Sequence, residues 1–311
     1  LLQNTDVEVV GVSRSEEYES IFLPYKYNKP SSSRFKFNRL DVNKDLESIL
    51  DLLDEEKPDT IVNYSAQGEV RNSWRNPLQW FQTNCMAVVA LSDALKDKSY
   101  LKRYVAISTP EVYGSTEEDL KENHNYNPST PYAASKLAGD LFLETLHKKT
   151  NFPVIFTRSA NVYGIHQQLF RIIPKTLINL NSGKKIELHG EGKTQRGFIH
   201  VRDVADATYK AIQRGNLGES YHLASESPIS IYSLVKSICN MTGKNFKNSV
   251  VLKKENFGQD ALYSLDSSKA RQELGWTPKI NLNTGIAEVI EWINKNWEVI
   301  KSLPSDYIHK E

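Results

Sequence analysis

The hydrophobic and polar positions of the first 164 residues form two alternating patterns. Short apolar runs, typical of strands, cover residues 7–12, 60–64, 104–108 and 154–157. Between them, longer stretches with helical periodicity cover residues 46–53, 80–95 and 132–146. Strands that are apolar at every position are buried on both faces, as in parallel sheets covered by helices. The alternation therefore predicts an α/β fold with a doubly wound parallel sheet.

After Gly164 the pattern changes to that of a smaller α+β lobe. Helical periodicity covers residues 172–180, 204–213, 230–242, 267–274 and 284–297, and short extended runs cover 186–188, 197–200 and 221–223. We expect a larger domain of residues 1–164 plus about 198–224, and a smaller lobe of about 165–197 plus 225–311. Ligands of doubly wound sheets lie at the carboxyl ends of the strands, where these two units are expected to meet.

Composition and charge exclude several classes of protein. The 311 residues include 39 basic and 38 acidic side chains, and the net charge of +1 provides no general attraction for nucleic acid or an anionic membrane. No run of about 18 apolar residues is present to span a membrane. The two cysteines, Cys85 and Cys239, are too few for a disulfide scaffold and have no metal-ligand spacing. We therefore expect a cytoplasmic protein without a structural metal.

The helix expected at 132–146 opens with Tyr132-Ala-Ala-Ser-Lys136. Residues four apart share a helix face, so the Lys136 ammonium is expected beside the Tyr132 phenol, where it lowers the pKa of the phenol. Such a phenol is a usable general base for a sugar or alcohol hydroxyl. A surface tyrosine and lysine one turn apart would show the same spacing. The break at Pro128-Ser-Thr-Pro131 favours the base, because it places Tyr132 in the first turn, near the carboxyl edge of the sheet.

A second polar group, Ser108, Thr109 and Glu111, follows the strand expected at 104–108. Its side chains emerge at the carboxyl end of that strand, where Tyr132 is also expected. A polar turn whose hydroxyls bond their own backbone is the simpler alternative. Beside Tyr132, however, the hydroxyls can orient a substrate oxygen and the Glu111 carboxylate can move a proton.

These two motifs occur together with four others in a fixed order. The six are Pro-Asp-Thr-Ile-Val at 58–62 leading to Ser-Ala-Gln at 65–67, Ser-Thr-x-Glu-Val-Tyr-Gly at 108–114, Pro-Tyr-x-x-Ser-Lys at 131–136, Arg-x-x-Asn-x-Tyr-Gly at 158–164, Arg-x-Phe-x-x-Val-x-Asp-Val-Ala at 196–205, and Asp-x-Ser-Lys-Ala-Arg-x-x-Leu-Gly-Trp-x-Pro at 266–278. Over nearly the whole chain they resemble the extended short-chain dehydrogenase/reductases acting on nucleotide sugars, particularly the NDP-hexose 4,6-dehydratases. The resemblance implies a Rossmann-type dinucleotide-binding domain for the larger unit and a nucleotide-sugar-binding lobe for the smaller one.

The resemblance also implies a reaction, the elimination of water from a nucleotide sugar with a recycled nicotinamide cofactor. Tyr132, with Lys136 beside it, removes the proton of the sugar C4 hydroxyl while the C4 hydride passes to the nicotinamide. Thr109 is hydrogen-bonded to the C4 oxygen, and Ser108 is a further orienting hydroxyl. Glu111 then removes the C5 proton, water leaves from C6, and the hydride returns to C6.

Glu111 distinguishes between members of the resembled family. The 4-epimerases generally have a small or neutral residue there, so Glu111 favours a dehydratase. UDP-sugar decarboxylases share the Ser-Thr-x-Glu pattern and remain an alternative. A non-catalytic dinucleotide-binding sensor or scaffold is an alternative of another class, against which the presence of Tyr132, Lys136 and Glu111 argues.

Pro110 departs from the pattern of many glucose dehydratases, which have an aspartic acid that protonates the departing C6 oxygen. Proline has no proton to donate. Either Glu111 acts as both base and acid, or a water or another side chain supplies the proton. The identity of the substrate sugar therefore stays open.

The cofactor candidates begin at the end of the strand expected at 7–12. An acid normally holds the ribose hydroxyls of NAD there, whereas this chain has Ser13-Arg14-Ser15. A guanidinium and hydroxyls suit a 2′-phosphate, which slightly favours NADP over NAD. The alternative is that NAD binds and a solvated Arg14 stacks on its adenine, and the sequence favours NADP over this alternative only slightly. Further candidates by resemblance are Asp41 and Val42 on the adenine side, and Ser65, Ala66 and Gln67 under the cofactor. Tyr132 and Lys136 are expected to contact the cofactor as well.

The family also opens with a strand and a Gly-x-x-Gly-x-x-Gly turn, whose backbone approaches the cofactor pyrophosphate. This sequence opens at Leu1-Leu-Gln-Asn4, which is similar to the end of the family's first helix, and it contains no such glycine cluster. A complete βαβ unit would need roughly twenty further residues before Leu1, and we expect them in the natural protein. Without them the sheet would lack a central strand.

Candidates for binding the substrate diphosphate are Asn161, Arg171 and Arg196, with Asn84 as a further substrate-binding candidate by its place in the matching motifs. Arginine gives bidentate, charge-assisted bonds to phosphate. Relatives often have an arginine after Gly-x-Asp, whereas this chain reads Gly258-Gln-Asp-Ala-Leu262. One diphosphate contact is therefore expected to be missing or supplied elsewhere.

A homodimer is the expected assembly. In relatives, the helices corresponding to 80–95 and 132–146 pair with a second subunit as a four-helix bundle. The apolar run from Cys85 to Leu91 fits such an interface. Cover by another helix of the same chain would explain it too.

Overall fold

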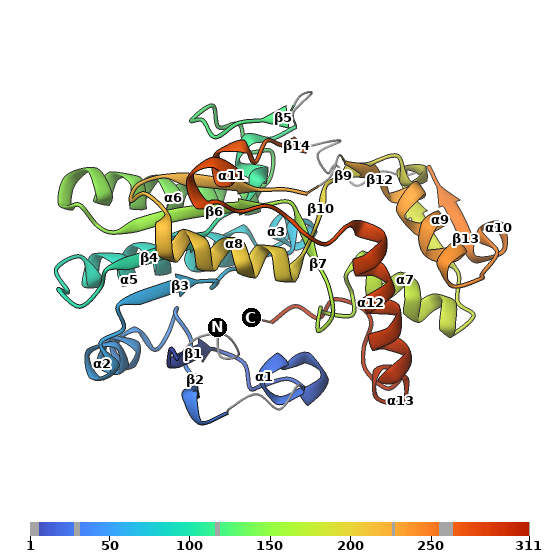
Figure 1. Cartoon of the computed structure of the whole chain (residues 1–311), viewed down its shortest axis with the longest axis horizontal. Helices are drawn as coiled ribbons and strands as arrows, with labels where there is room; N and C mark the ends of the chain where they lie inside the picture. Colours follow the sequence, from blue (N-terminus) through green and yellow to red (C-terminus); the bar gives the residue numbers. More distant parts are fainter. Residues whose placement is uncertain (1–5, 28–31, 116–118, 226–227, 255–263, 311) are drawn as a thin grey trace.

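Four parallel strands form the centre of the larger part of the molecule. The computed structural model describes residues 6–27, 32–115, 119–225, 228–254 and 264–310. The strands are β3 (Thr60–Asn63), β4 (Arg103–Ile107), β6 (Val154–Ser159) and β11 (Ser220–Leu223), in the spatial order β11-β6-β4-β3 (Figure 1). All three strand pairs are parallel, so the predicted doubly wound α/β architecture is confirmed.

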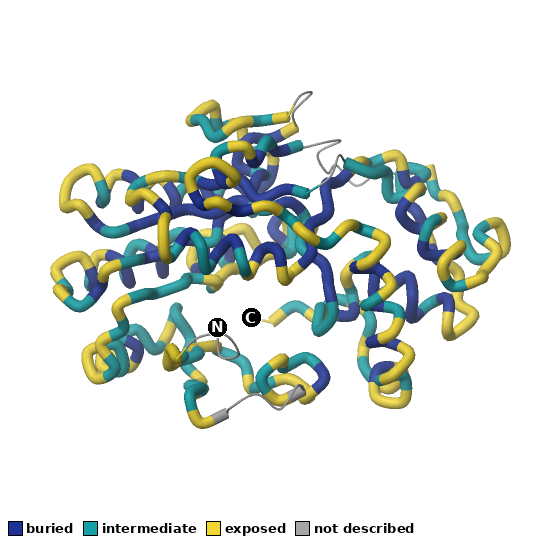
Figure 2. The backbone as a smooth tube through the Cα atoms, in the orientation of Figure 1, coloured by how far each residue is buried: buried dark blue, intermediate teal, exposed yellow. Residues whose placement is uncertain are grey.

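Successive residues of β6 face opposite layers of helices, because side chains alternate across a strand. Phe156 belongs to the buried cluster on the side of α6 (Pro131–Thr150), whereas Ile155 belongs to the cluster on the side of α8 (Val201–Arg214). Both side chains are fully buried. Figure 2 shows the central strands as a buried layer between more exposed helices. Burial on both faces explains why the first half of this strand, from Val154 to Phe156, is apolar.

Two further strands form a separate parallel pair. In it, β1 (Val9–Ser13) pairs with β2 (Phe35–Arg39), from Val9 opposite Phe35 to Ser13 opposite Arg39. Among the described residues, neither strand is hydrogen-bonded to the four-stranded sheet. The sequence pattern missed β2, because its charged and polar positions alternate with aromatic ones in only five residues.

The helix predicted at 80–95 is a composite of three elements. It begins as α4 (Pro77–Phe81), passes through a π-helical turn, η3 (Gln82–Met86), and continues as α5 (Ala87–Leu95). π-turns of this kind are rare and often occur at functional sites. A Cβ on Gly139 of α6 would lie 2.4 Å from the Asn84 carbonyl oxygen, so the backbone of α6 packs directly on this turn.

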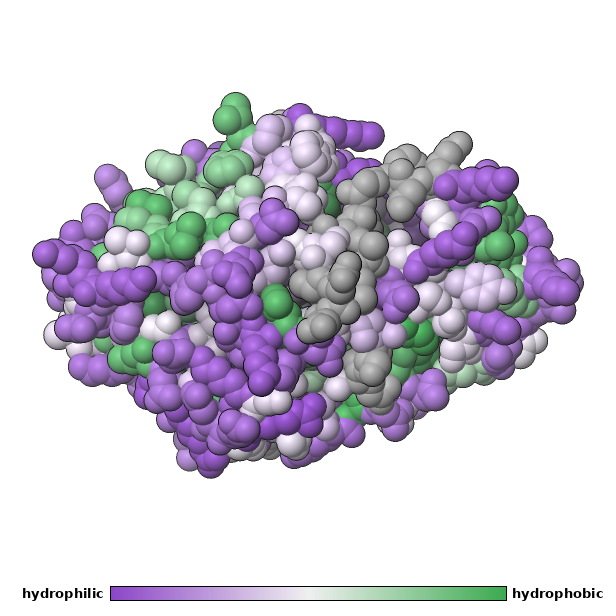
Figure 3. Space-filling model, turned by 90° about the horizontal axis from the view of Figure 1, so that it is seen from above, coloured by the Kyte–Doolittle hydropathy of each residue, from purple (hydrophilic) through white to green (hydrophobic). Residues whose placement is uncertain are grey.

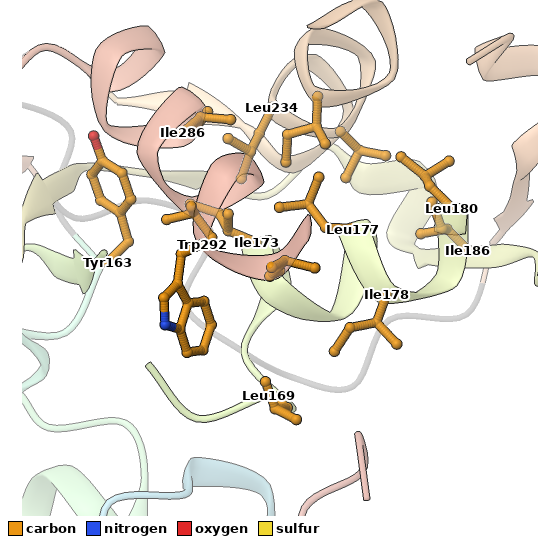
Figure 4. Packing of buried hydrophobic residues seen from close by; sticks show 14 of the residues in the cluster. Tyr163, Leu169, Ile173, Leu177, Ile178, Leu180, Ile186, Leu234, Ile286 and Trp292 are labelled. Carbon is orange, nitrogen blue, oxygen red and sulfur yellow. The ribbon is translucent and has the colours of Figure 1, made fainter. Parts of the chain in front are cut away.

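The smaller lobe has its own hydrophobic core. Its main helices are α7 (Ile172–Asn181), α9 (Ile231–Met241) and α12 (Leu282–Lys295), and a parallel strand pair, β8 (Ile186–His189) and β13 (Val250–Lys253), lies beside them. Figure 4 shows Ile173, Leu177, Leu234 and Ile286 from these helices meeting in one cluster, with Trp292 at its side. Tyr163, the last residue of β7 (Asn161–Tyr163), also belongs to this core.

The remaining elements are short or connect the two parts. They are η1 (Ser20–Phe22), α1 (Pro24–Tyr27), η2 (Ser32–Arg34), α2 (Leu46–Glu56), α3 (Val70–Ser73), η4 (Pro110–Tyr113), β5 (Asp119–Leu120), β7 (Asn161–Tyr163), η5 (Gly190–Gly192), β9 (Gln195–Arg196), β10 (Phe198–His200), β12 (Ile229–Ser230), α10 (Phe246–Ser249), β14 (Ser264–Leu265), α11 (Ser268–Leu274) and α13 (Trp297–Ile300). Within the described ranges, no helix combines the length and apolarity needed to cross a membrane.

Candidate active site

The phenol of Tyr132 lies where the end of β4 meets the start of α6. Thr130 is the N-cap of α6 and its hydroxyl oxygen accepts a hydrogen bond from the Ala133 amide at 3.1 Å, while Pro131 occupies the first helical position. Both residue types favour a helix start at these positions. Tyr132 therefore sits in the first turn, as predicted.

Thr109 and Glu111 reach the same place from the other side. Thr109 caps the short helix η4, and its hydroxyl oxygen accepts a hydrogen bond from the Glu111 amide at 3.3 Å. The Thr109 side chain is also hydrogen-bonded to the Tyr132 phenol, and the Glu111 carboxylate is close enough to act on that phenol electrostatically. The structure thus brings together three of the predicted catalytic side chains: a phenol, a hydroxyl and a carboxylate.

The expectation of a lowered phenol pKa is wrong for this state of the protein. Burial raises the pKa of Tyr132 well above its ordinary value, because the buried site disfavours the phenolate, and the negative charge of Glu111 adds to the rise. The Thr109 hydrogen bond and the positive charge of Arg171 oppose it. Lys136 is not among the largest of these influences on Tyr132.

Lys136 instead lies behind the site. Its ammonium donates a hydrogen bond to the Ile107 carbonyl oxygen, at the end of β4, at a distance of 2.7 Å. The side chain is buried, and burial lowers the pKa of Lys136, with Asp140 opposing and Arg158 adding to that effect. The ammonium therefore ties the first turns of α6 to the carboxyl end of β4, the strand that presents Thr109.

Ser108 belongs to a buried network rather than to the substrate side. Its hydroxyl donates to the Asp140 carboxylate, which also accepts from the Arg158 guanidinium at 3.2 Å. Arg158 further donates to the Tyr113 hydroxyl at 2.7 Å and to the Tyr126 hydroxyl at 3.3 Å. Because the Ser108 proton is committed to Asp140, the expected substrate-orienting role of this hydroxyl is not supported.

The sequence analysis did not predict the ion pair between Asp140 and Arg158, which is the main unexpected feature of the site. Arg158 was noted only as the first residue of the Arg-x-x-Asn-x-Tyr-Gly motif. Asp140 lies four residues after Lys136, on the same face of α6. That spacing is the one local signal that could have indicated it. The pair holds the end of β4 against α6 and thereby supports the geometry of Thr109 and Tyr132.

Asn84 likewise has a positioning role. Its side-chain oxygen accepts from the Gln67 amide at 2.8 Å, and its side-chain nitrogen donates to the Gln67 carbonyl at 3.1 Å and to the Ser135 hydroxyl at 2.9 Å. Both N–H bonds of the amide are used and the residue is 1% exposed. The expected substrate contact of Asn84 is therefore corrected: the amide joins the segment after β3 to η3 and α6.

Ser13, Arg14 and Ser15 lie at the carboxyl end of β1, as the resemblance implied. A cavity of about 230 Å³ beside them is lined by Ser13, Ser15 and Tyr18 among others. The Arg14 guanidinium donates to the Lys310 carbonyl oxygen at 3.0 Å. Hydroxyls and a guanidinium are therefore present where a dinucleotide ribose is expected.

The other cofactor candidates lie at neighbouring positions of the sheet edge. Asp41 caps the turn after β2, where its carboxylate accepts from the Asn43 amide at 2.9 Å, and Val42 packs partly buried against the core. Ser65 donates to the Asn63 side chain, Ala66 is exposed, and the Gln67 side chain donates to the Lys310 carbonyl at 3.2 Å.

The substrate candidates are spread over the start of the smaller lobe. Arg171 is the exposed N-cap residue of α7, and its charge acts on Tyr132. Asn161 is the first residue of β7, and Arg196 is buried, donating to the Gln195 carbonyl at 2.7 Å. The Gly258–Leu262 run lies outside the described residues.

Metal and disulfide chemistry were not expected. In the parts of the chain that the structure describes, no cluster of three or more His, Cys, Asp or Glu side chains could hold a metal ion. Cys85 and Cys239 are free thiols, and burial raises the pKa of each.

Comparisons with known proteins agree with this geometry. Residues 1–289 match the family model of GDP-mannose 4,6 dehydratase. The chain is 30% identical over 283 residues to a dTDP-glucose 4,6-dehydratase of Haemophilus influenzae, covering 84% of this chain and 83% of that protein. It is 31% identical over 272 residues to a trifunctional UDP-glucose 4,6-dehydratase/UDP-4-keto-6-deoxy-D-glucose 3,5-epimerase/UDP-4-keto-L-rhamnose-reductase of Arabidopsis thaliana, covering 86% of this chain but 40% of that relative.

Solved structures show the same fold. The crystal structure of a dTDP-glucose 4,6-dehydratase from Streptomyces venezuelae, with NAD and TYD bound, has a TM-score of 0.84 at 26% identity, covering 95% of this chain and 90% of that one. The parallel sheet and the Tyr132 site therefore define an extended short-chain dehydrogenase/reductase of the NDP-sugar 4,6-dehydratase type. Within that class, the chain belongs to the GDP-mannose 4,6 dehydratase family.

Proposed function

We propose that the protein carries out the 4,6-dehydration of an NDP-hexose, with Tyr132, Thr109 and Glu111 as the groups that touch the sugar. The observation that carries this proposal is the meeting of these three side chains at the end of β4 and the start of α6. An epimerase needs the phenol and the hydroxyl but has no use for a carboxylate beside them. Glu111 therefore favours elimination over epimerisation.

The chain's residues act in two steps on the sugar. In its phenolate form, which the Thr109 hydrogen bond and the Arg171 charge favour against the effect of burial, Tyr132 accepts the proton of the C4 hydroxyl as C4 becomes a ketone. Thr109 holds the C4 oxygen by a hydrogen bond. Glu111 removes the proton from C5, which the neighbouring ketone acidifies, and the C6 hydroxyl leaves as water. A nicotinamide dinucleotide, held by the residues that follow β1 and β3, would supply the hydride exchange between C4 and C6, so that the net change would be the loss of one water.

The proton for the departing C6 oxygen must come from a group other than residue 110. Pro110 is buried and occupies the first position of η4, so it fixes the backbone that presents Glu111. We assign this transfer to Glu111, which takes the proton from C5 and gives it to the C6 oxygen. C5 regains a proton when hydride is delivered to C6, and the proton that Tyr132 accepted from the C4 hydroxyl balances it. A water or another side chain as the acid is the alternative.

A nicotinamide dinucleotide is the cofactor that the donor set fits. Ser13, Arg14 and Ser15 would hold its adenosine ribose, with Asp41 and Val42 on the adenine side. Gln67, with Ser65 and Ala66, would lie under the pyrophosphate and nicotinamide ribose. The guanidinium beside two hydroxyls slightly favours NADP over NAD.

Substrate binding would engage the diphosphate through Asn161, Arg171 and Arg196. The larger domain, of residues 1–164 plus about 198–224, would hold the dinucleotide, and the lobe of about 165–197 plus 225–311 would hold the nucleotide sugar. This division is supported by the separate core around α7, α9 and α12. We also propose a cytoplasmic location. The free thiols of Cys85 and Cys239 are compatible with a reducing compartment.

The homodimer is supported by apolar side chains that lie exposed on α4, η3 and α6. Leu78 is 84% exposed, Phe81 38%, Met86 54% and Leu141 43%. The face of the molecule seen in Figure 3 is mostly hydrophilic, with hydrophobic residues gathered in separate patches. An exposed apolar patch of this kind on paired helices is typical of a subunit interface.

The proposed function is tested by incubating the protein with a panel of NDP-hexoses and either dinucleotide. A 4-keto-6-deoxy product, detected by its absorbance in alkali and by mass, is expected from at least one sugar. Glu111→Gln is expected to keep dinucleotide binding and to lower turnover by 10²-fold or more. Carbon dioxide release from a UDP-uronic acid, or a C4 epimer as sole product, would establish the alternative enzymes, and binding of dinucleotide without turnover would establish the sensor.

A further inference from the structure

The short helix η4 carries Glu111 and points three consecutive side chains in three directions. A helix of this type has about three residues per turn, so neighbouring side chains lie about a third of a turn apart. Val112 is fully buried and packs in one cluster with Leu137 of α6, and Tyr113 is 4% exposed. Glu111 is close enough to Tyr132 for its charge to act on the phenol. The anchoring of Val112 and Tyr113 therefore determines where the Glu111 carboxylate lies.

The Tyr113 hydroxyl is held by hydrogen bonds of defined direction. It accepts from the Arg158 guanidinium at 2.7 Å and lies 2.9 Å from Nε2 of His222. The other ring nitrogen of His222, Nδ1, lies 2.9 Å from the Leu120 carbonyl oxygen, which can only accept, so Nδ1 carries the proton. Nε2 is therefore an acceptor, and the Tyr113 hydroxyl donates to it. The Asn123 backbone amide also acts on this hydroxyl through a hydrogen bond.

Arg158 and His222 belong to two neighbouring strands of the central sheet. They lie directly opposite each other in the parallel register of β6 and β11, so their side chains leave the same face of the sheet. Both are fully buried. Burial and the Arg158 charge lower the pKa of His222 to about 3, so Nε2 stays an acceptor at neutral pH. The sheet thus offers Tyr113 a fixed donor and a fixed acceptor side by side.

The aromatic ring of Tyr113 is held as well. The Arg158 guanidinium carbon lies 5.2 Å from the centroid of this ring, and the His222 ring meets it edge to face with centroids 5.4 Å apart. The Asn127 amide secures the end of η4 by donating to the Val112 carbonyl oxygen at 3.0 Å. A rotation of η4 about its axis, which would move Glu111, must break these contacts.

The role of Glu111 in the proposed reaction depends closely on its position. The carboxylate takes a proton from C5 and gives it to the C6 oxygen, because Pro110 has no proton to donate. One carboxylate can serve two neighbouring atoms only from a narrow range of positions, and a displacement of about 1 Å can lower a rate by about 10²-fold. Tyr132 and Thr109, which act at C4, are placed by the start of α6 and the end of β4 instead.

We propose that Tyr113 and His222 are positioning residues for the elimination step, and that they hold η4 so that Glu111 lies against C5 and C6 of the sugar. This inference rests on the proposed function. Both residues are buried, and they act through the backbone of η4 rather than by touching the sugar. Loss of the bond between them slows proton transfer from C5, whereas oxidation at C4 and binding of the sugar are preserved.

The test compares Tyr113→Phe with Tyr126→Phe as a matched control. Each substitution removes one hydroxyl that accepts from Arg158, and the two rings stack on each other, but Tyr126 lies outside η4. Steady-state rates are measured with an NDP-hexose that the unaltered protein converts, deuterated at C5 or, separately, at C4. The isotope effect is a ratio of rates, so it does not depend on how much of a variant is folded.

In Tyr113→Phe we expect kcat to fall about tenfold or more, with KM within about twofold of its original value. The isotope effect of C5 deuterium on kcat is expected to rise, because proton transfer from C5 becomes the slow step, and that of C4 deuterium is not. In Tyr126→Phe both isotope effects are expected to equal those of the unaltered protein.

Two substitutions of His222 give a second readout. His222→Leu removes the acceptor of the Tyr113 hydroxyl, whereas the amide oxygen introduced by His222→Gln can replace it. We expect the C5 isotope effect to rise in His222→Leu and to return toward its original value in His222→Gln. Equal C5 isotope effects in the two variants would overturn the role of His222.

An unchanged C5 isotope effect in Tyr113→Phe, or an equal rise in Tyr113→Phe and Tyr126→Phe, would overturn the positioning role of Tyr113 and leave the proposed function intact. Absence of a 4-keto-6-deoxy product from the unaltered protein with every sugar of the panel would instead overturn the proposed function, and this inference with it.

Discussion

The Arg158 guanidinium donates a hydrogen bond to the Asp140 carboxylate at 3.2 Å, and the two side chains are only 1% and 4% exposed. The carboxylate also accepts from Ser108, at the end of β4, while the guanidinium reaches two tyrosine hydroxyls. A buried charge is tolerated only when it is paired and hydrogen-bonded. This pair therefore holds the carboxyl end of the sheet against α6, directly behind the proposed catalytic side chains.

Replacing Asp140 by asparagine is expected to destabilise the fold strongly. The Arg158 charge would remain buried without its counter-charge, which costs about 3–5 kcal/mol. Urea denaturation measures the free energy of unfolding. Asp306→Asn is the control, since Asp306 forms an exposed ion pair with Lys175, and it should change stability by less than about 1 kcal/mol. Equal effects of the two substitutions would contradict a structural role for the buried pair.

His222 is expected to make stability fall in acid. Burial and the nearby Arg158 charge lower the pKa of His222 to about 3, whereas an unfolded chain has a histidine pKa of about 6.5. As the pH falls below about 6.5, the unfolded state takes up a proton that the folded state does not accept until about pH 3. The stability present above pH 6.5 is therefore lost across this window, by about 2 kcal/mol between pH 7 and pH 5.

Urea denaturation of His222→Gln at the two pH values tests this. The variant has an altered hydrogen bond to Tyr113, so only the difference between pH 7 and pH 5 is compared. That difference should shrink by about 2 kcal/mol in His222→Gln and stay unchanged in His124→Gln, where the side chain is 75% exposed. An undiminished difference in His222→Gln would refute the assignment.

Thr109→Val is expected to move the pH profile of the reaction toward alkali. The hydrogen bond from Thr109 opposes the burial that raises the pKa of Tyr132, and valine cannot make it. The phenolate of the free enzyme would then form at a higher pH. We therefore expect kcat/KM at neutral pH to fall, and the pH range in which kcat/KM rises to shift to higher pH. The control Thr145→Val removes an exposed hydroxyl that bonds the Leu141 carbonyl on α6. A lower rate without a shift in the profile would mean that Thr109 acts only in binding.

Leu78→Glu is expected to convert a dimer into monomers. A charge at this exposed position of α4 would be buried without a partner if α4 and α6 pair with a second subunit. Light scattering coupled to size exclusion measures the mass in solution. Leu252→Glu, on β13 of the smaller lobe and 47% exposed, is the matched control and should leave the mass unchanged. A monomeric unaltered protein, or a Leu78→Glu variant that stays dimeric, would rule out this interface.

Much of the architecture follows from local patterns. Short apolar runs predict β3, β4 and the first half of β6, because strands covered by helices favour apolar side chains. Pro131 after Thr130 marks the start of α6, because both residues suit helix N-termini. Two short motifs identify the family, one with Tyr132 and Lys136 and the other with Thr109 and Glu111. Each is contained in a few consecutive residues, so it can be recognised in the sequence alone.

Such local patterns do not predict contacts between residues that are far apart in the sequence. Asp140 meets Ser108 across 32 positions, and Arg158 meets Tyr113 across 45. Whether a hydroxyl faces substrate or a buried carboxylate, and whether an ammonium lies beside a phenol or against a carbonyl, depends on how helices and strands pack. Local propensity acts over one or two helical turns, whereas desolvation and the satisfaction of buried hydrogen bonds act on every group that the folded chain brings within a few ångströms. The raised pKa of Tyr132 and the saturated amide of Asn84 are therefore properties of the folded molecule.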